Sequence, residues 1–406
     1  MGSELELFMF SPSVGPGFPL LLPKGALIRR LLEEFAYEIK TKYGLTFVWT
    51  PHVAKSDLYK QSKHWQKYDA MMPPLKIEED EYTLKPMNCP HHFQVYLNKP
   101  WSYRELPLRL AENGTVYRFE KSGEINGLLR VRALTQDDSH WFVPHEMLAE
   151  EIHRALSLTK EIYSTFGLKN FYARISSHDP KNFEKYLGQK KTWENAEKAL
   201  EEAVKKQKIQ YSIGIGEAVF YGPKIDIMIR DSLGREWQVT TIQLDFNQPE
   251  NFNLLYRDKD GQDKRPAILH VAIFGSIERF MAILIEHFAG AFPLWLSPVQ
   301  VAVLPISDKQ VKYAQKIVAE LQENNIRTDF YNKPESIGKK IREAELRKIP
   351  YMLIVGEKEQ KAKTVAVRAR NQPARRSLGE GGKDLGAMKL DKFIGRVLKE
   401  IKNKSL

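Results

Sequence analysis

The pattern of apolar segments changes once along the 406 residues, near Pro298. Before this point, short apolar runs such as 113–120 and 128–138 are separated by charged turns, which is typical of antiparallel strands. After it, strand-like segments at 299–306 and 326–331 alternate with helical patterns. The sequence therefore predicts an α+β domain with an antiparallel sheet over 1–297. A smaller α/β domain with a largely parallel sheet follows over 298–406.

Several elements can be placed within these two domains. Apolar residues at helical spacing and a terminal glycine predict a helix over 24–44. Residues 45–53 resemble a strand interrupted by Pro51, which indicates an edge or an interface. The remaining expectations are strands within 218–246 joined by a turn at 231–234, helices over 194–208, 276–290, 309–324, 337–347 and 389–401, a linker at 292–298, strands at 351–356 and 364–370, and a surface insertion at 371–382.

The positive charge is confined to the second domain. The chain has a net charge of +11, and residues 298–406 contain 24 Lys and Arg against 13 Asp and Glu. The first 297 residues are therefore neutral overall. A segregated basic module suggests contact with a polyanion, most often a nucleic acid, although a solvated basic surface without a partner gives the same pattern.

The composition limits the cellular compartments in which the chain is expected to lie. No apolar run approaches the roughly 18 residues of a membrane span, and the first residues do not resemble a signal peptide. The single cysteine excludes an intramolecular disulfide framework. We therefore expect a cytoplasmic protein without a membrane partner.

Several arginines lie in or beside apolar segments instead of in charge runs. Such arginines are usually paired or functional, because an unpaired buried charge is costly. Together with Lys224 they can hold a triphosphate and stabilise its developing charge. The alternative is structural ion pairing with Glu112, Glu120, Asp137 and Asp138. The arginines concerned are Arg118, Arg130, Arg132 and Arg279.

A metal site is a second possibility. Cys89 is followed by His91 and His92, but these neighbours make a poor zinc knuckle because further ligands are not local. His140 and His270 lie on apolar, strand-like segments. A site of Cys89 with these two would leave one coordination position open, as in reactive zinc sites. The alternative is a buried inert thiol.

Several segments resemble one known family of enzymes. Residues 114–120 with 128–142 resemble motif 2 of the class II aminoacyl-tRNA synthetases, 275–280 resembles motif 3, and the helix leading into 47–53 resembles motif 1. Residues 85–90, 135–140, 219–225 and 242–246 are together similar to the threonyl-tRNA synthetase family. The resemblance implies an antiparallel catalytic domain of six or seven strands and an α/β anticodon-binding domain. It also implies a homodimer contacted through Pro51.

The resemblance implies a threonine–tRNA ligase that forms threonyl-adenylate from threonine and ATP with Mg²⁺, and then charges tRNA(Thr). Zinc would be held by Cys89, His140 and His270 and would bind the amino and hydroxyl groups of threonine. With this ligand set, the adjacent His91 and His92 are expected to be loop residues. The other implied residues are Met87, Gln136, Asp138, Tyr221 and Gln243 for threonine; Arg118, Glu120, Arg130, Gln238 and Arg279 for ATP; Arg118, Arg279, Lys224 and His64 for catalysis; and Glu359 and Arg368 for the anticodon.

Some features depart from the family pattern. Val271 stands where an arginine is common, and Leu134 stands where some members have an aromatic residue. The family usually has N-terminal domains, one of which removes misattached serine, and this sequence is expected to lack them. Two other functions stay open: a class II synthetase for proline or serine, and a synthetase-like RNA-binding or regulatory protein.

Overall fold

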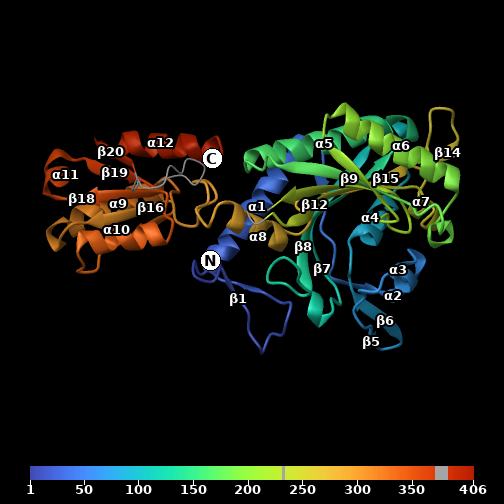
Figure 1. Ribbon diagram of the computed structural model, residues 1–406, viewed down its shortest axis with the longest axis horizontal. Helices are drawn as coiled ribbons and strands as arrows, with labels where there is room; N and C mark the ends of the chain where they lie inside the picture. Colours follow the sequence, from blue (N-terminus) through green and yellow to red (C-terminus); the bar gives the residue numbers. More distant parts are fainter. Residues whose placement is uncertain (231–233, 371–382) are drawn as a thin grey trace. The chain divides into compact units, whose positions relative to one another are not determined.

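The computed structural model describes residues 1–230, 234–370 and 383–406 (Figure 1). Its contacts divide the chain into two compact units. One consists of Met1–Met9, Leu21–Leu31 and Leu284–Leu406, and the other of Phe10–Leu20 and Leu32–Ile283. The domain boundary at 297/298 stays a prediction. The turn predicted at 231–234 lies mostly outside the described residues, and the insertion predicted at 371–382 lies entirely outside them.

The larger unit contains an eight-stranded sheet. Its six central strands pair antiparallel, as predicted, and the two edge strands β10 and β3 each pair in parallel with their neighbour. The order is β10 (Tyr211–Ile215), β9 (Phe171–Ser177), β11 (Lys224–Arg230), β12 (Glu236–Asp245), β15 (Ala267–Ala272), β8 (Ala133–Val143), β7 (Leu108–Tyr117) and β3 (Thr46–Phe47).

The strand predicted at 45–53 is instead two short strands, β3 and β4 (Val53–Lys55), with Pro51 between them. A proline has no N–H to donate to a ladder, which explains the interruption. Strand β4 belongs to a separate small sheet with β6 (Asp80–Leu84) and β5 (Leu75–Ile77). The two-residue strands are β1 (Phe8–Met9), β2 (Leu20–Leu21), β13 (Tyr256–Arg257) and β14 (Asp263–Lys264).

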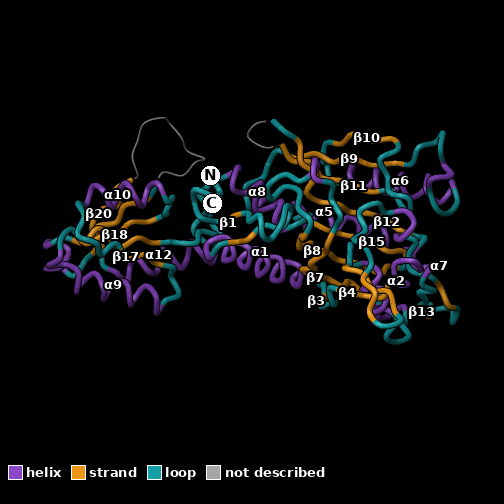
Figure 2. Tube along the Cα trace, turned by 90° about the horizontal axis from the view of Figure 1, so that it is seen from below, coloured by secondary structure: helices purple, strands orange, loops and turns teal. Residues whose placement is uncertain are grey.

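Helices cover one face of the large sheet (Figures 1 and 2). Helix α5 (Leu148–Thr165) contacts β12 and β15, and α6 (Lys190–Lys206) contacts β9 and β11. Helix α1 (Pro23–Lys42) reaches the same face, where Lys40 pairs with the buried Asp137 of β8. Because side chains alternate along a strand, the neighbours of Asp137 on β8 point to the opposite face. On that face, α3 (His64–Lys67) and α4 (Cys89–Tyr96) line one cavity together with β8, and α2 (Ser56–Gln61) contacts α3.

The helices predicted over 24–44, 194–208 and 276–290 are confirmed as α1, α6 and α8 (Ile277–His287), with small shifts at their ends. A short helix α7 (Gln248–Asn251) follows β12. Four phenylalanines pack between α1, the end of α5 and α8. Phe166 meets Phe35 and Phe280 edge-on at centroid distances of 5.4 and 5.0 Å, and Phe274 stacks on Phe280 at 4.4 Å. Such aromatic pairs add to the stabilisation from burial.

The smaller unit contains a five-stranded sheet with the order β17 (Thr328–Phe330), β16 (Val301–Pro305), β18 (Tyr351–Val355), β19 (Val365–Ala369) and β20 (Lys383–Met388). The prediction of a largely parallel sheet is wrong for its second half. Strand β16 runs parallel to β17 and β18, but β19 is antiparallel to both β18 and β20. The connection 356–364 is too short for a parallel crossover, so the chain turns back.

Among its described residues, this unit includes the helices α9 (Val311–Glu323), α10 (Ile337–Leu346), α11 (Glu357–Ala362) and α12 (Leu390–Lys402). Helix α11 and strand β20 were not predicted. Residues 292–298, predicted as a linker, contain neither helix nor strand. Their side chains are mostly buried, and Leu294 joins the apolar core of this unit. Among the described residues, no helix is both long and apolar enough to pass through a membrane.

Candidate active site

The strand register places four polar side chains in a row across the large sheet. His140 on β8 pairs with His270 on β15, His270 pairs with Gln243 on β12, and Gln243 pairs with Lys224 on β11. Directly opposite residues point to the same face of a sheet. These four side chains therefore share the face that the long helices leave uncovered. They line a cavity of about 560 Å³.

Residues two positions along the strands line the same cavity. On β8, Leu134, Gln136, Asp138 and His140 all do so, which is the period of two expected for one face of a strand. Asp138 accepts a hydrogen bond from Nδ2 of Asn88 at 3.1 Å. The cavity thus has a long, mostly polar wall that is formed by one face of the sheet.

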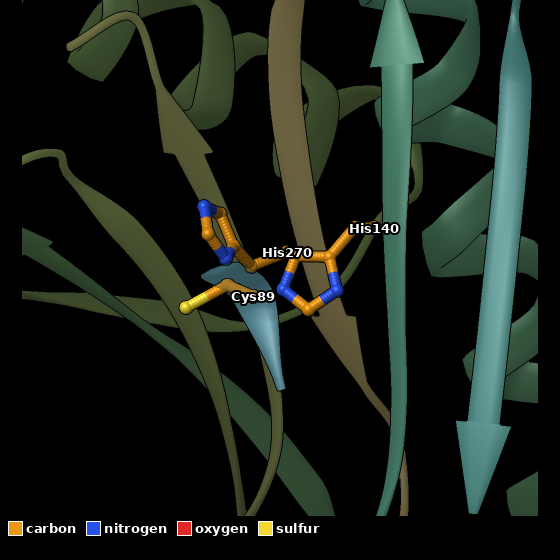
Figure 3. Close-up of side chains that lie close together, drawn as sticks. All are labelled: Cys89, His140 and His270. Carbon is orange, nitrogen blue, oxygen red and sulfur yellow. The ribbon is translucent and has the colours of Figure 1, made fainter. Parts of the chain in front are cut away.

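Cys89, His140 and His270 form a cluster at one end of this cavity (Figure 3). Their ligand atoms all lie within 4.8 Å of one another, and all three residues are buried. Cys89 is the first residue of α4, whereas the two histidines come from paired strands. Nε2 of His270 lies 3.0 Å from Oδ2 of Asp245, and Nδ1 of His140 lies 2.8 Å from Nδ1 of His92.

The donor set fits zinc. One sulfur and two imidazole nitrogens match its preferences, and three protein ligands leave a position for substrate. The second nitrogen of each imidazole is already engaged, which is the usual arrangement for metal-binding histidines. Burial raises the pKa of the Cys89 thiol, and burial also lowers the pKa of His140. A bound cation would instead lower the pKa of the Cys89 thiol, because coordination deprotonates a thiol outright.

The interpretation of His91 and His92 as loop residues is wrong. Both lie on α4 and are buried, with exposed fractions of 7% and 0%. The ring of His91 approaches the hydroxyl of Tyr59 at 3.4 Å, whereas His92 contacts His140.

The residues predicted to bind threonine all line the cavity. They are Met87, Gln136, Asp138, Tyr221 and Gln243. The hydroxyl of Tyr221 donates to Oε1 of Gln243 at 3.3 Å, while Nε2 of Gln243 is buried and has no hydrogen-bond partner in the described structure. A buried donor without a partner is costly, so this amide is available to a ligand oxygen.

The predicted cationic residues Arg118, Arg279 and Lys224 line the same cavity. Nε of Arg118 donates to the carbonyl of Pro86 at 3.2 Å, and Arg279 donates to the carbonyls of Leu129 and Gln238 at 2.9 and 3.1 Å. Within the described residues, neither arginine has a carboxylate partner. Burial, followed by the positive charges of Arg118 and Arg130, lowers the pKa of Arg279. This wall of the cavity is therefore suited to an anion.

Lys224 differs from the arginines, because its ammonium lies 2.6 Å from Oδ2 of Asp226. The amide of Gln238 donates to Oδ1 of the same aspartate at 2.7 Å. His64 lines the cavity from α3, and its Nδ1 lies 2.8 Å from Oγ of Ser62. Burial, followed by the nearby His270, lowers the pKa of His64 to about 3, so its ring is neutral at ordinary pH.

Two predicted ATP residues, Glu120 and Arg130, lie outside the cavity lining. Arg130 contacts the carboxylate of Glu120 at 2.7 Å and that of Glu124 at 3.0 Å. Arg132 donates to the backbone carbonyl of Glu120 at 3.0 Å. The alternative of structural ion pairing therefore applies to Arg130 in this structure.

The remaining predicted residues are not among those that line the cavity. Pro51 is exposed. In the smaller unit, Glu359 accepts a hydrogen bond from the N–H of Gly356 at 2.9 Å at the start of α11, and Arg368 on β19 pairs with Glu345 at 3.1 Å. The residues missed from the sequence are those that support the cluster: Asn88, His92, Glu112 and Asp245. Asn88 and Asp245 gave a signal, because they lie in the segments 85–90 and 242–246 that resemble the family, whereas Glu112 was considered only as an ion-pair partner of the arginines.

The chain is similar to known proteins. Residues 74–288 match the family described as tRNA synthetase class II core domain (G, H, P, S and T), and residues 300–400 match the anticodon binding domain. The threonine–tRNA ligases of Chloroherpeton thalassium and Chlorobium phaeobacteroides are each 49% identical to the chain. Both alignments cover all of the chain and 61% of the relative. The chain thus spans about three fifths of the length of these curated relatives.

Solved structures are also similar. The structure of the RNA binding domain of threonyl-tRNA synthetase from Cryptosporidium parvum superposes with a TM-score of 0.90 at 39% identity, covering 98% of this chain and 97% of that one. A prolyl-tRNA synthetase from the same organism superposes with a TM-score of 0.71 at 14% identity, covering 99% and 74%, and shows the shared fold alone. The chain therefore belongs to the threonyl-tRNA synthetases, within the class II tRNA synthetase family.

Proposed function

We propose that the chain is the catalytic and anticodon-binding part of a threonine–tRNA ligase. The observation that supports this most directly is the Cys89, His140 and His270 cluster at one end of a cavity whose other wall contains Arg118 and Arg279. An amino acid bound at the cluster would extend its carboxylate toward the arginines. The cavity thus has one end for a side chain with metal-binding groups and another for a phosphate.

Selection of threonine follows from the chemistry of the cluster. When bound, zinc would act as a Lewis acid toward the amino and hydroxyl groups of threonine. Asp138, held by Asn88, would accept the hydrogen of the hydroxyl, and Tyr221, Gln243, Gln136 and Met87 would enclose the rest. A site that pairs with a hydroxyl rejects valine strongly, whereas serine lacks only a methyl group and is rejected weakly.

Activation would consist of attack by the threonine carboxylate on the α-phosphate of ATP, with loss of pyrophosphate. This step needs positioning and charge stabilisation more than a protein nucleophile. Arg118 would bridge the carboxylate and the α-phosphate, Lys224 would lie near that phosphate, and Arg279 would hold the outer phosphates with Mg²⁺. Gln238 would contact the ribose.

Glu120 would bind the adenine amino group, and Arg130 would bind the outer phosphates. We expect the ion pair between these two residues to open when ATP binds. The neutral imidazole of His64 would then serve proton transfer as the threonyl group moves to the terminal hydroxyl of tRNA(Thr).

The partners follow from the same assignment. Glu359 and Arg368 would contact the anticodon from the basic second domain, and the exposed Pro51 would lie in a homodimer interface. The lone thiol serves a metal site instead of a disulfide, which fits the reducing cytoplasm.

The test is amino-acid-dependent exchange of pyrophosphate into ATP, with zinc content measured on the same sample. We expect about one zinc per chain and exchange with threonine but not valine. A Cys89→Ala chain should lose both the zinc and the preference for threonine. Stimulation by proline or valine but not threonine would contradict the proposal, and no exchange in a zinc-loaded sample would favour a regulatory protein.

A further inference from the structure

Two buried side chains behind the metal cluster form a hydrogen-bonded chain that leads away from it. Nδ1 of His92 lies 2.8 Å from Nδ1 of His140, and Nε2 of His92 lies 3.1 Å from Oε2 of Glu112. The side chains of His92 and Glu112 are only 0% and 2% exposed. We propose that Glu112 and His92 are positioning residues, which fix the tautomer and orientation of His140. The inference rests on the metal site proposed above.

The direction of each hydrogen bond in the series His140–His92–Glu112 follows from the carboxylate of Glu112 at its far end. An ionised carboxylate accepts hydrogen bonds and donates none, so Nε2–H of His92 must donate to Glu112. In a neutral imidazole the other nitrogen then has a bare lone pair. Nδ1 of His92 therefore accepts from Nδ1–H of His140. This leaves Nε2 of His140 with the lone pair that a metal requires.

Glu112 is itself held in place by two other segments. Its carboxylate accepts from the backbone N–H of Thr50 at 2.7 Å and from the hydroxyl of Thr50 at 2.9 Å, and the ammonium of Lys85 lies at 3.5 Å. On the sheet, Glu112 pairs in register with Asp138. The carboxylate therefore has a fixed position, and its orientation is passed through the ring of His92 to His140.

The two histidine ligands are thus held in different ways. His270 contacts the carboxylate of Asp245 directly, whereas His140 reaches a carboxylate only through a second imidazole. Loss of an outer hydrogen-bond partner typically lowers metal affinity about 10- to 100-fold. Removal of the acceptor on His92 should therefore weaken zinc binding even though no ligand is changed.

Two variants of His92 separate positioning from packing. His92→Leu keeps most of the volume but removes the acceptor. His92→Asn keeps an oxygen near the place of Nδ1, so it can still accept from His140. The matched control is His91→Leu, because His91 is the adjacent buried histidine of the same helix and its ring approaches Tyr59 instead of a ligand.

Zinc affinity of the whole chain is measured by competition with a chromophoric chelator, alongside the visible spectrum of the Co²⁺-loaded chain and the unfolding midpoint without metal. We expect His92→Leu to bind zinc about 10- to 100-fold more weakly and to alter the Co²⁺ bands. His92→Asn should recover most of the affinity. His91→Leu should stay within about threefold of the starting chain, even where its metal-free midpoint falls as far as that of His92→Leu.

Four results would overturn the inference. Equal zinc affinities for His92→Leu and the starting chain would show that His92 does not position the ligand. Equal losses in His91→Leu and His92→Leu, or no recovery with asparagine, would show general destabilisation. If the starting chain itself binds neither zinc nor Co²⁺, the proposed metal site fails and this inference fails with it.

Discussion

Protonation of Glu112 should measurably weaken the fold in acid. Burial raises the pKa of this carboxyl, but the hydrogen bond from His92, the charge of Lys85 and the N–H of Thr50 outweigh it and lower the pKa to about 2. The ordinary value is 4.5. Because the folded pKa is depressed, the stabilisation is present above pH 4.5 and is lost as the pH falls toward 2.

The size of this stabilisation follows from the shift in the pKa of Glu112. A change of one pKa unit corresponds to about 1.4 kcal/mol, so the full shift corresponds to roughly 3 kcal/mol in the free energy of unfolding. Linkage gives a loss of about 1 kcal/mol by pH 4 and about 2 kcal/mol by pH 3. Other carboxyl groups titrate in the same range, so the wild-type chain alone cannot isolate this contribution.

The variant Glu112→Gln isolates it, because glutamine keeps the shape but does not titrate. Urea unfolding of the metal-free chains at pH 6, 5 and 4 gives the stability difference between wild type and variant at each pH. We expect the wild type to be more stable at pH 6 and its advantage to shrink by about 1 kcal/mol at pH 4. A difference that is constant over this range, or that grows in acid, would refute the reasoning.

Three further predictions concern other residues. Arg279→Lys keeps the charge but loses the planar fork that reaches two carbonyls. It should reduce threonine-dependent pyrophosphate exchange by about 10²- to 10³-fold with an unchanged circular dichroism spectrum. Lys40→Met leaves Asp137 buried without its cation and should cost about 3–5 kcal/mol at pH 7 by urea unfolding. The exposed pair of Lys42 with Glu161 is the control, since Lys42→Met should cost less than about 1 kcal/mol. In pyrophosphate exchange, kcat/KM for serine should lie about 10- to 200-fold below that for threonine, whereas valine should be about 10⁴-fold worse. A serine ratio as large as that of valine would contradict a site that selects through the hydroxyl.

The sequence predicted long periodic elements better than short ones. Helices α1, α6 and α8 and the antiparallel pair β7 and β8 follow from patterns within each segment. Strand β20 and the short helix α11 gave too few periods to recognise. Strand β19 runs antiparallel to β18 because the connection between them is short. An alternation of strands and helices in the sequence does not reveal this direction.

The candidate site was predictable in its residue types and not in its geometry. A lone thiol and two histidines on apolar segments suggested a metal site, but no local pattern places His140 opposite His270. That pairing depends on β8 and β15 being neighbours in the sheet and on their register. The series of hydrogen bonds through His92 and Glu112 was missed because these residues lie on a helix and on a strand that only the fold brings together.

The buried pair on the far side of β8 bears on why the register is unique. Asp137 faces α1 and binds Lys40, and its Oδ1 accepts from the N–H of Phe274 at 2.9 Å. Its neighbour Asp138 faces the cavity. A slip of β8 by one residue would exchange the two faces, so Asp138 and His140 would point toward the helices and Asp137 would enter the cavity. A slip that brought Gln136 to the place of Asp137 would also bury Lys40 without a carboxylate, which costs several kcal/mol. The pair of Lys40 and Asp137 therefore disfavours a slip in that direction, which would also dismantle the metal cluster.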